Sequence, residues 1–372
     1  MQVRSLLVAA VALSATLAAC SSSDGDGDGP DDAGRDAAAT SAEDFGGLDG
    51  LVTAAEKEGT LNVVGLLPER AGYAAVVAAF EAKYDVDVRS EDPEAGGADQ
   101  VAAAIELEGT DDAPDVFDLG QSVALANADL FAPYRVATFD DIPQVFKDPE
   151  GAWVNDYGGF MSIGYDSEKV PDITGVDDLL DPALQGKVAL NGDPRQVGAA
   201  FIGVLMASLA HGGSADDLAP GVDFFEQLEA AGNFLQVDTT AGTIESGETP
   251  VVIDWDYVNA AATATVDTWE VVVPEGVAIA GYYFQAINKG APHPAAARLW
   301  QEFLYSDEGQ NLWLAGGVRP VRADAMLAAG TIDRERYDAL PEVSGDPVIP
   351  TNEQTEAMAA YLADAWTDVV GG

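Results

Sequence analysis

The sequence predicts an α/β fold, and three observations support this. Short apolar runs typical of buried strands alternate with segments of helical periodicity from residue 48 onward. The joins between these segments are short, as in repeated strand–helix units. The chain has 372 residues, 48% of them hydrophobic, which is enough for a large core in one or two domains, with two favoured by the length.

The first half of the chain predicts three strand–helix units in succession. Ligands of such sheets bind beyond the carboxyl ends of the strands, so the loops after the first and third strands are candidate binding segments. These loops contain Arg70, Gln121 and Ser122. The expected elements are helix 48–58, strand 61–67, helix 69–84, strand 86–90, helix 99–107 and strand 114–119.

The second half predicts another α/β unit, and no tandem repeat is visible. Its most unusual segment is VVIDWDYVN (251–259), in which an apolar strand leads directly into two carboxylates on either side of a tryptophan. The other expected elements are helix 177–184, strand 187–191, helix 194–210, helix 221–230 and helix 295–304.

The composition excludes several classes of partner and site. The formal net charge of -47 repels nucleic acid and anionic lipid headgroups and attracts cations. The single cysteine, Cys20, leaves no disulfide within the chain, and two histidines are too few for the usual zinc sites. We therefore expect no metal centre of that kind, no other cofactor and no direct contact with nucleic acid.

The N-terminus reads as a targeting segment. Arg4 precedes the apolar stretch 6–17, which is too short for a stable membrane span, and Leu17-Ala18-Ala19-Cys20 follows. This resembles a bacterial lipobox, which implies a signal peptide over 1–20 and a lipidated Cys20 that anchors the protein to the cell membrane from outside the cytoplasm. Residues 21–44 are rich in Asp, Gly, Ser and Ala, and predict a disordered acidic linker.

Several short segments occur in a specific order along residues 58–330. They are AFEAKY (79–84), DVF (115–117), GYDS (164–167), GE before VVIDWDY (247–257), AINKGA (286–291) and GVRPVR (317–322). With these segments in this order, and with the lipobox, the chain resembles the extracellular solute-binding proteins of bacterial ABC importers, in particular the subgroup with polyamine, ferric-iron, thiamine and phosphonate binders.

The resemblance implies a two-lobed, periplasmic-binding-protein-like fold whose lobes are joined by crossover strands and close on a ligand between them. Lobe one is expected over 45–160 plus 270–318, and lobe two over 161–269 plus 319–372. It further implies a monomer without catalysis that delivers a small-molecule solute to the permease subunits of an ABC importer.

The VVIDWDYVN segment supplies four candidate ligand-binding residues. Strand alternation places Asp254 and Asp256 on one face and Trp255 and Tyr257 on the other, unless the strand ends near Asp254. A carboxylate beside an aromatic face suits an ammonium group, through charge pairing and cation–π attraction. The alternative is a strand end whose aspartates cap the following helix.

Further candidates lie in three other segments. Tyr282 and Tyr283 follow the second crossover, where alternation predicts that one faces the cleft and the other the core. Arg195 follows Asp193 and Pro194, which read as the cap and first residue of a helix, and a helix N-terminus with an arginine can hold an anion. Tyr157 precedes the first crossover and is expected on the hinge side of the cleft.

The favoured solute is a small polyamine-like cation. Ferric iron and an organophosphonate or other anion remain as alternatives, although ferric relatives carry a tyrosine pair where this chain has only Tyr257. A less favoured alternative is an anchored hydrolase with a carboxylate pair. The chain has no Gly-x-Ser-x-Gly elbow and no His-Glu-x-x-His helix, and its only cysteine lies in the lipobox, so the sequence predicts a binding protein.

Overall fold

The computed structural model describes residues 30–68, 71–237 and 239–369. The expected signal peptide, Cys20 and the first part of the expected linker therefore lie outside the described residues, as does candidate Arg70. Within the described part of the chain, no helix combines the length and the apolar character needed to cross a bilayer.

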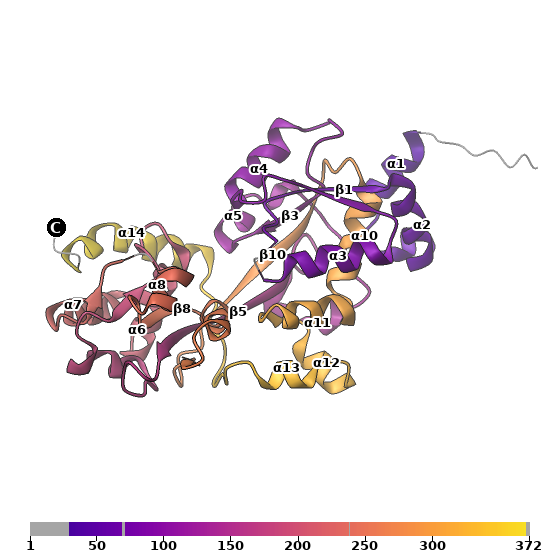
Figure 1. Cartoon of the computed structure of the whole chain (residues 1–372). Coiled ribbons are helices and arrows are strands. Elements are labelled where there is room, and N and C mark those ends of the chain that lie inside the picture. Colours follow the sequence, from indigo (N-terminus) through magenta and orange to yellow (C-terminus); the bar gives the residue numbers. More distant parts are fainter. Residues whose placement is uncertain (1–29, 69–70, 238, 370–372) are drawn as a thin grey trace, which may run out of the picture.

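Two long strands join two lobes (Figure 1). They are β5 (Val154–Asp166) and β10 (Ala280–Asn288), which pair antiparallel over residues 154–160 and 280–285. Beyond Phe160, β5 pairs instead with β8 (Val251–Trp255) of the other lobe. All 13 residues of β5 are buried. The expected two-lobed α/β fold with crossover strands is confirmed.

The main sheet is mixed, whereas the strand–helix alternation predicts a parallel one. Across the described residues it runs in the order β3-β10-β5-β8-β6-β7. β6 is parallel to β8 and β7, but β10 is antiparallel to β3 and β5, and β5 to β8. The difference arises because the two crossover strands insert between the parallel units and run against their neighbours, which alternation along the chain does not reveal.

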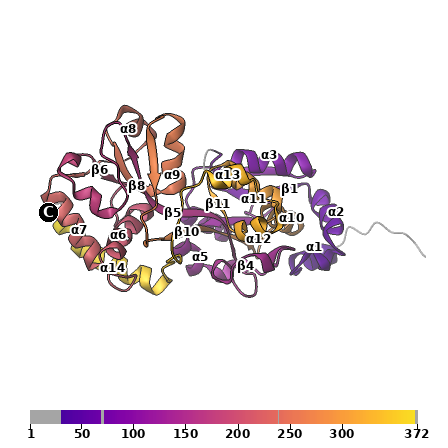
Figure 2. The same ribbon diagram turned by 90° about the horizontal axis from the view of Figure 1, so that it is seen from below.

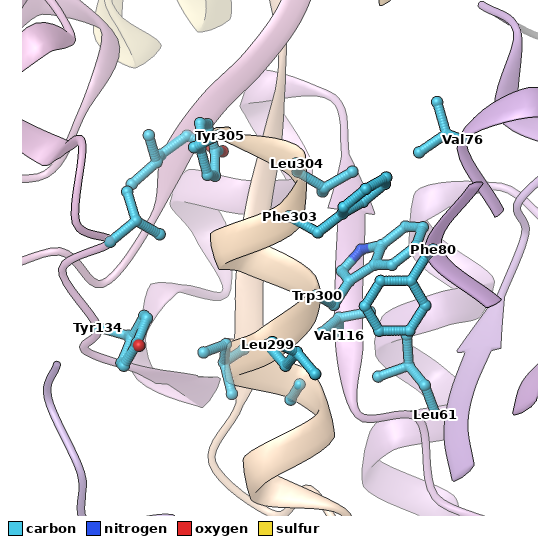
Figure 3. Packing of buried hydrophobic residues seen from close by; sticks show 14 of the residues in the cluster. Leu61, Val76, Phe80, Val116, Tyr134, Leu299, Trp300, Phe303, Leu304 and Tyr305 are labelled. Carbon is cyan, nitrogen blue, oxygen red and sulfur yellow. The ribbon is translucent and has the colours of Figure 1, made fainter. Parts of the chain in front are cut away.

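The core of lobe one surrounds helix α10, which is buried along its whole length. Figure 3 shows Trp300 and Phe303 of this helix against Phe80, with ring centroids 5.0 and 5.5 Å apart. Besides parts of β5 and β10, the lobe contains α2 (Leu48–Glu58), β1 (Thr60–Val64), α3 (Tyr73–Lys83), β2 (Asp87–Glu91), α4 (Gly97–Glu106), β3 (Val116–Leu119), α5 (Gln121–Ala126), β4 (Phe131–Ala132), α10 (Pro294–Leu304), α11 (Asp307–Ala315), β11 (Arg319–Pro320), α12 (Ala323–Ala329) and α13 (Arg334–Asp338).

Lobe two covers its own sheet with helices from distant parts of the sequence (Figure 2). Phe225 contacts Trp366 of the last helix, with ring centroids 5.2 Å apart. The lobe contains β6 (Val188–Leu190), α6 (Gly198–Ala210), α7 (Ala219–Ala230), β7 (Phe234–Leu235), α8 (Ala241–Ser246), β8, α9 (Asp256–Ala261), β9 (Trp269–Val272) and α14 (Asn352–Val369). The helix expected over 177–184 is replaced by two 3₁₀ turns, Val176–Leu180 and Pro182–Leu184.

The expected linker is partly ordered. Helix α1 (Pro30–Ala37) and a 3₁₀ turn at Ala42–Phe45 precede lobe one. The buried guanidinium of Arg298 donates hydrogen bonds to the carbonyls of Ala37 and Ala39, at 2.7 and 2.8 Å. The prediction of a linker that is disordered up to residue 44 is therefore wrong. Its carbonyl groups at residues 37 and 39 accept hydrogen bonds from Arg298 of α10.

The lobe boundaries also differ from those expected. Residues 269–272 form β9, which pairs with β5 inside lobe two. The chain therefore returns to lobe one only near residue 280, and not at residue 270 as predicted. Residues 319–340 stay with lobe one, where Met326 and Ile332 pack on Leu314 of α11. Of the expected C-terminal return, α14 lies on lobe two, and Val348 bridges to Ile279 on the way. The chain passes between the lobes in the predicted order, but it leaves lobe one for the last time about 25 residues later than predicted. The reason is that residues 319–340 bury their apolar side chains on lobe one.

Candidate functional site

A cavity of about 500 Å³ lies between the lobes. Lobe one contributes Gly120, Gln121 and Ser122, lobe two contributes the ends of β6 and β8, and β10 contributes Ala280–Tyr283. Its size is typical of a site for a small molecule. We call it the aromatic chamber, after the six lining residues that give it its character: Phe201, Asp254, Trp255, Tyr257, Tyr282 and Tyr283.

Two parallel strands of lobe two deliver polar side chains to this cavity. β6 and β8 are paired in register, with Leu190 opposite Ile253, so the residues that follow them meet at one edge of the sheet. Asn191 follows β6, and Asp254 lies at the end of β8. The Nδ2 group of Asn191 donates to Oδ2 of Asp254 at 2.6 Å.

Asp254 is a buried carboxylate at the cavity wall, with 1% of its surface exposed. Oδ1 accepts the backbone N–H of Trp255 at 2.7 Å. Burial raises the pKa of Asp254 to about 6, and the hydrogen bonds from Trp255 and Asn191 offset only part of this rise. The carboxylate is therefore mostly ionised at neutral pH but poorly solvated, which makes it a strong attractor for a cation.

Two glycines allow aromatic rings from lobe two to lie against the crossover strands. A Cβ at Gly281 would lie 2.3 Å from Cη2 of Trp255, and a Cβ at Gly159 would lie 2.7 Å from Cδ1 of Tyr257. Such distances are too short for any side chain, so only glycine fits at both positions. Trp255 and Tyr257 thus line the cavity while they contact the backbone of the hinge.

Both Tyr282 and Tyr283 line the cavity, whereas alternation predicts one in the cleft and one in the core. The pairing of β10 with β5 shifts register between Tyr282 and Phe284, and this irregularity breaks the alternation. Tyr157 does not line the cavity, contrary to the prediction. It is fully buried and stacks on Tyr283, with ring centroids 5.2 Å apart, so it supports a cleft residue from beneath.

Gln121 and Ser122 lie at the cavity as predicted, but they begin helix α5 instead of a loop. Ser122 is exposed at the rim. The side-chain amide of Gln121 donates to the carbonyl of Pro350, just before α14 of lobe two. This hydrogen bond joins the two lobes across the cavity.

The structure contradicts the prediction that Asp256 faces the ligand. β8 ends at Trp255, and Asp256 begins α9. Its carboxylate accepts the guanidinium of Arg319 at 3.0 Å and the N–H of Phe160 at 3.0 Å, and it is 2% exposed. Burial still raises the pKa of Asp256, and Arg319 opposes this rise. Asp256 therefore binds the hinge together and is not a cleft residue.

Arg195 lies away from the aromatic chamber, contrary to the prediction. α6 begins at Gly198 and not at Pro194, so Asp193 does not cap it. Asp193 instead accepts hydrogen bonds from the backbone and the guanidinium of Arg195, the latter at 2.6 Å. The arginine is engaged by its neighbour, and the expected anion site at a helix N-terminus does not form.

Sequence reasoning missed several cavity residues: Asn191, Phe201, Ile202, Pro350 and Thr355. The position of Asn191 could have been predicted, because it is the last residue of the expected strand 187–191, which lies parallel to β8. The other four had none, because their position depends on how α6 and α14 pack. Among the described lining residues, Asp254 is the only charged side chain. No group of three or more His, Cys, Asp or Glu in the described part of the chain is arranged to hold a metal ion.

Known proteins resemble this chain in sequence and in fold. The family model of bacterial extracellular solute-binding proteins matches residues 111–339, which is more than half of the chain. No curated protein matches the sequence.

Solved structures share the fold at low sequence identity. An ABC transporter protein from Clostridium perfringens is 15% identical, with a TM-score of 0.61 over 83% of this chain and 99% of its own. The ferric binding protein from Campylobacter jejuni is 17% identical, with a TM-score of 0.61 and the same coverage. The periplasmic binding protein AfuA from Actinobacillus pleuropneumoniae, with fructose-6-phosphate bound, is 21% identical, with a TM-score of 0.60 over 84% of this chain and 98% of its own.

The matching family consists of proteins that bind solutes outside the cytoplasm and do not transform them. The cavity agrees with this role, since it lies between two lobes joined by crossover strands. The chain is therefore not the anchored hydrolase considered above, and it belongs to the family of bacterial extracellular solute-binding proteins.

Proposed function

We propose that this protein captures a small, polyamine-like organic cation between its lobes and delivers it to the permease of an ABC importer. One observation carries the choice of ligand. The aromatic chamber has five aromatic side chains and one carboxylate, Asp254, and its described lining residues include no Lys, Arg or His.

An ammonium group matches both parts of this lining. Aromatic faces attract cations through the ring quadrupole, by about 0.5–2 kcal/mol each. A buried carboxylate without a counter-charge is costly, and a bound cation relieves that cost. Because burial has raised the pKa of Asp254 to about 6, we expect a bound cation to lower it again.

An anionic solute is less well supported. Phosphate and phosphonate groups are normally held by arginine or by several N–H donors. Arg195, which the sequence offered for this purpose, is paired with Asp193 outside the aromatic chamber. The fructose-6-phosphate in AfuA belongs to a protein only 21% identical to this one, and carries no weight for the solute here.

Ferric iron is the second candidate, and a specific observation favours it. Tyr257, Tyr282 and Tyr283 all line the aromatic chamber, together with Asp254. Phenolate and carboxylate oxygens are hard donors that suit Fe³⁺. Iron bound by these tyrosines would give a visible charge-transfer absorption, which an ammonium ligand would not.

Delivery follows from closure of the lobes and from tethering. The hydrogen bond from Gln121 to Pro350 joins the two lobes, so it is suited to stabilise the closed, ligand-bound form that a permease recognises. We further propose that lipidated Cys20 holds the protein, as a monomer, at the outer face of the cell membrane beside its permease.

Calorimetry and thermal unfolding of the full-length protein test the ligand. We expect polyamines to raise the melting temperature by mass action, while phosphonates have no effect and Fe³⁺ produces no visible band. Asp254→Asn should weaken polyamine binding about 10-fold or more, because a charge-assisted contact is lost. Asp223→Asn, the same change on the exposed face of α7, is the matched control and should bind normally.

Two outcomes would replace the proposal. A visible band with Fe³⁺ that is lost in a Tyr283→Phe variant would establish the ferric alternative. If a phosphonate raises the melting temperature of the wild type but not of Arg195→Ala, the solute is an anion bound at Arg195, and the cation proposal is wrong.

A further inference from the structure

A second cavity opens on the other side of the Asp254 wall. It has a volume of about 450 Å³ and also lies between the lobes, since Ala71 and Gly316 of lobe one line it together with residues of lobe two. We call it the threonine chamber, after Thr239, Thr240 and Thr265.

The two chambers meet at a common wall. Asn191, Asp254, Tyr257 and Val258 line both of them. The wall is held rigidly, because Asn191 donates to Asp254 at 2.6 Å and accepts the hydroxyl of Thr239 at 2.9 Å. Asp254 therefore lies at the wall that the two chambers share, and not at the far end of either one.

The two halves of this space differ in chemistry. The aromatic chamber presents rings from Trp255, Tyr282 and Tyr283. Apart from the shared wall, the threonine chamber presents threonine hydroxyl groups, small side chains and the aliphatic Ile244 and Val252, and Asp254 is the only charged residue among its described lining as well. A single negative charge thus serves both chambers, at the point where they join.

We propose that the solute is an elongated, unbranched molecule whose positive charge at an internal position pairs with Asp254, while its two arms extend into the two chambers. This rests on the proposed function and narrows it to amines with an internal ammonium group. A molecule charged only at its ends cannot fill both chambers and place a charge at the wall. The two arms are expected to meet different surroundings, since Trp255, Tyr282 and Tyr283 line only the aromatic chamber and the threonine hydroxyl groups line only the other.

Two linear amines of equal length test this directly. Spermidine has an internal secondary ammonium, and 1,8-diaminooctane has a methylene at that position and the same terminal groups. We expect spermidine to bind the full-length protein at least about 10-fold more tightly, since a charge-assisted hydrogen bond contributes about 1.5–3 kcal/mol. In Asp254→Asn this preference should disappear.

The second measurement uses a substitution that places a larger side chain in the threonine chamber. Ala261 is exposed at the end of α9 and lines this chamber but not the aromatic one. Ala261→Leu should weaken spermidine binding and leave the shorter diamine putrescine unaffected, since putrescine reaches only one chamber. Ala264→Leu, also exposed but outside both chambers, is the control and should change neither affinity.

The outcomes separate this inference from the proposed function. Equal affinities for spermidine and 1,8-diaminooctane would overturn the internal charge but leave a cation-binding protein. Loss of putrescine binding in Ala261→Leu would overturn the two-chamber arrangement in the same way. If no amine binds at all, the proposed function fails, and the inference fails with it.

Discussion

Asp254 and Asp256 lie two residues apart and are both almost fully buried, yet they belong to regions with different tasks. Asp254 ends β8 at the wall of the interlobe space, where its partners are an amide and a backbone N–H. Asp256 begins α9 in the hinge, where Arg319 neutralises it. Of these two carboxylates, the one with a cationic partner holds the hinge, and the one without such a partner lies at the wall of the interlobe cavity.

The hinge partner of Asp256 also ties distant segments together. The guanidinium of Arg319 lies 5.2 Å from the ring centroid of Phe160 on β5 and donates to the carbonyl of Pro341. The ion pair therefore joins β5, α9 and the segment that leads back to lobe two. Removal of either charge should affect the whole molecule and not one contact.

The largest expected effect is that of Arg319→Ala. It leaves Asp256 buried without a counter-charge, which should lower the free energy of unfolding by about 3–5 kcal/mol. Denaturant unfolding measures this. A double variant with Asp256→Asn should recover part of the loss, because the uncompensated charge is gone. A loss below about 1 kcal/mol in the single variant would show that the pair is not structural.

The next effect tests the contact between the hinge and the cleft. A Cβ at Gly159 would lie 2.1 Å from Oδ1 of Asp256 and 2.7 Å from Tyr257. Gly159→Ala should therefore lower the free energy of unfolding by about 1–3 kcal/mol and weaken ligand binding, because Tyr257 is displaced. At Gly175 nothing lies within 4 Å of an added Cβ, so Gly175→Ala should change neither quantity. If Gly159→Ala binds the ligand normally, the packing of the hinge does not affect the cleft, and this prediction is wrong.

The third effect depends on pH and tests the environment of Asp254. The pKa of Asp254 is raised from 3.8 to about 6, so the folded state takes up a proton in this range and the unfolded state does not. The cost of burying the charge is absent below pH 4 and complete above pH 6. Between these values it lowers the free energy of unfolding by up to about 3 kcal/mol.

Asp254→Asn should remove this contribution. The difference in unfolding free energy between variant and wild type should therefore move in favour of the variant as the pH rises from 4 to 7. Urea unfolding at four pH values gives the difference, in which the other titrating groups cancel. A difference that does not change with pH would mean that Asp254 is better solvated than its 1% exposure indicates.

Much of the element order was predictable because it depends on local patterns. Apolar runs predicted β1, β2, β3 and β6 within three residues, and helical spacing predicted α2, α4 and α7 within two. The errors occurred where contacts outweigh local signals. Asp193 and Pro194 resemble a helix start, but α6 begins at Gly198, since Asp193 is occupied by Arg195.

Part of the candidate site was predictable for the same reason. Gln121, Ser122, Asp254 and Trp255 lie at strand ends, which a pattern in the sequence can locate. Tyr157 and Asp256 were misplaced, because a stacking partner and an ion pair from distant segments decide their environment. Whether the cavity residues bind the solute stays a prediction.

By itself, the sequence determined the α/β class, the order of most elements, the charge balance and the short segments typical of the family, since these follow from composition and local periodicity. Only the tertiary structure decided that the sheet is mixed, that residues 319–340 stay with lobe one, and that Asp254 lines the interlobe cavity while Asp256 pairs with Arg319. The physical reason is that a buried charge is stable only with partners, and those partners come from segments up to 96 residues apart in the chain.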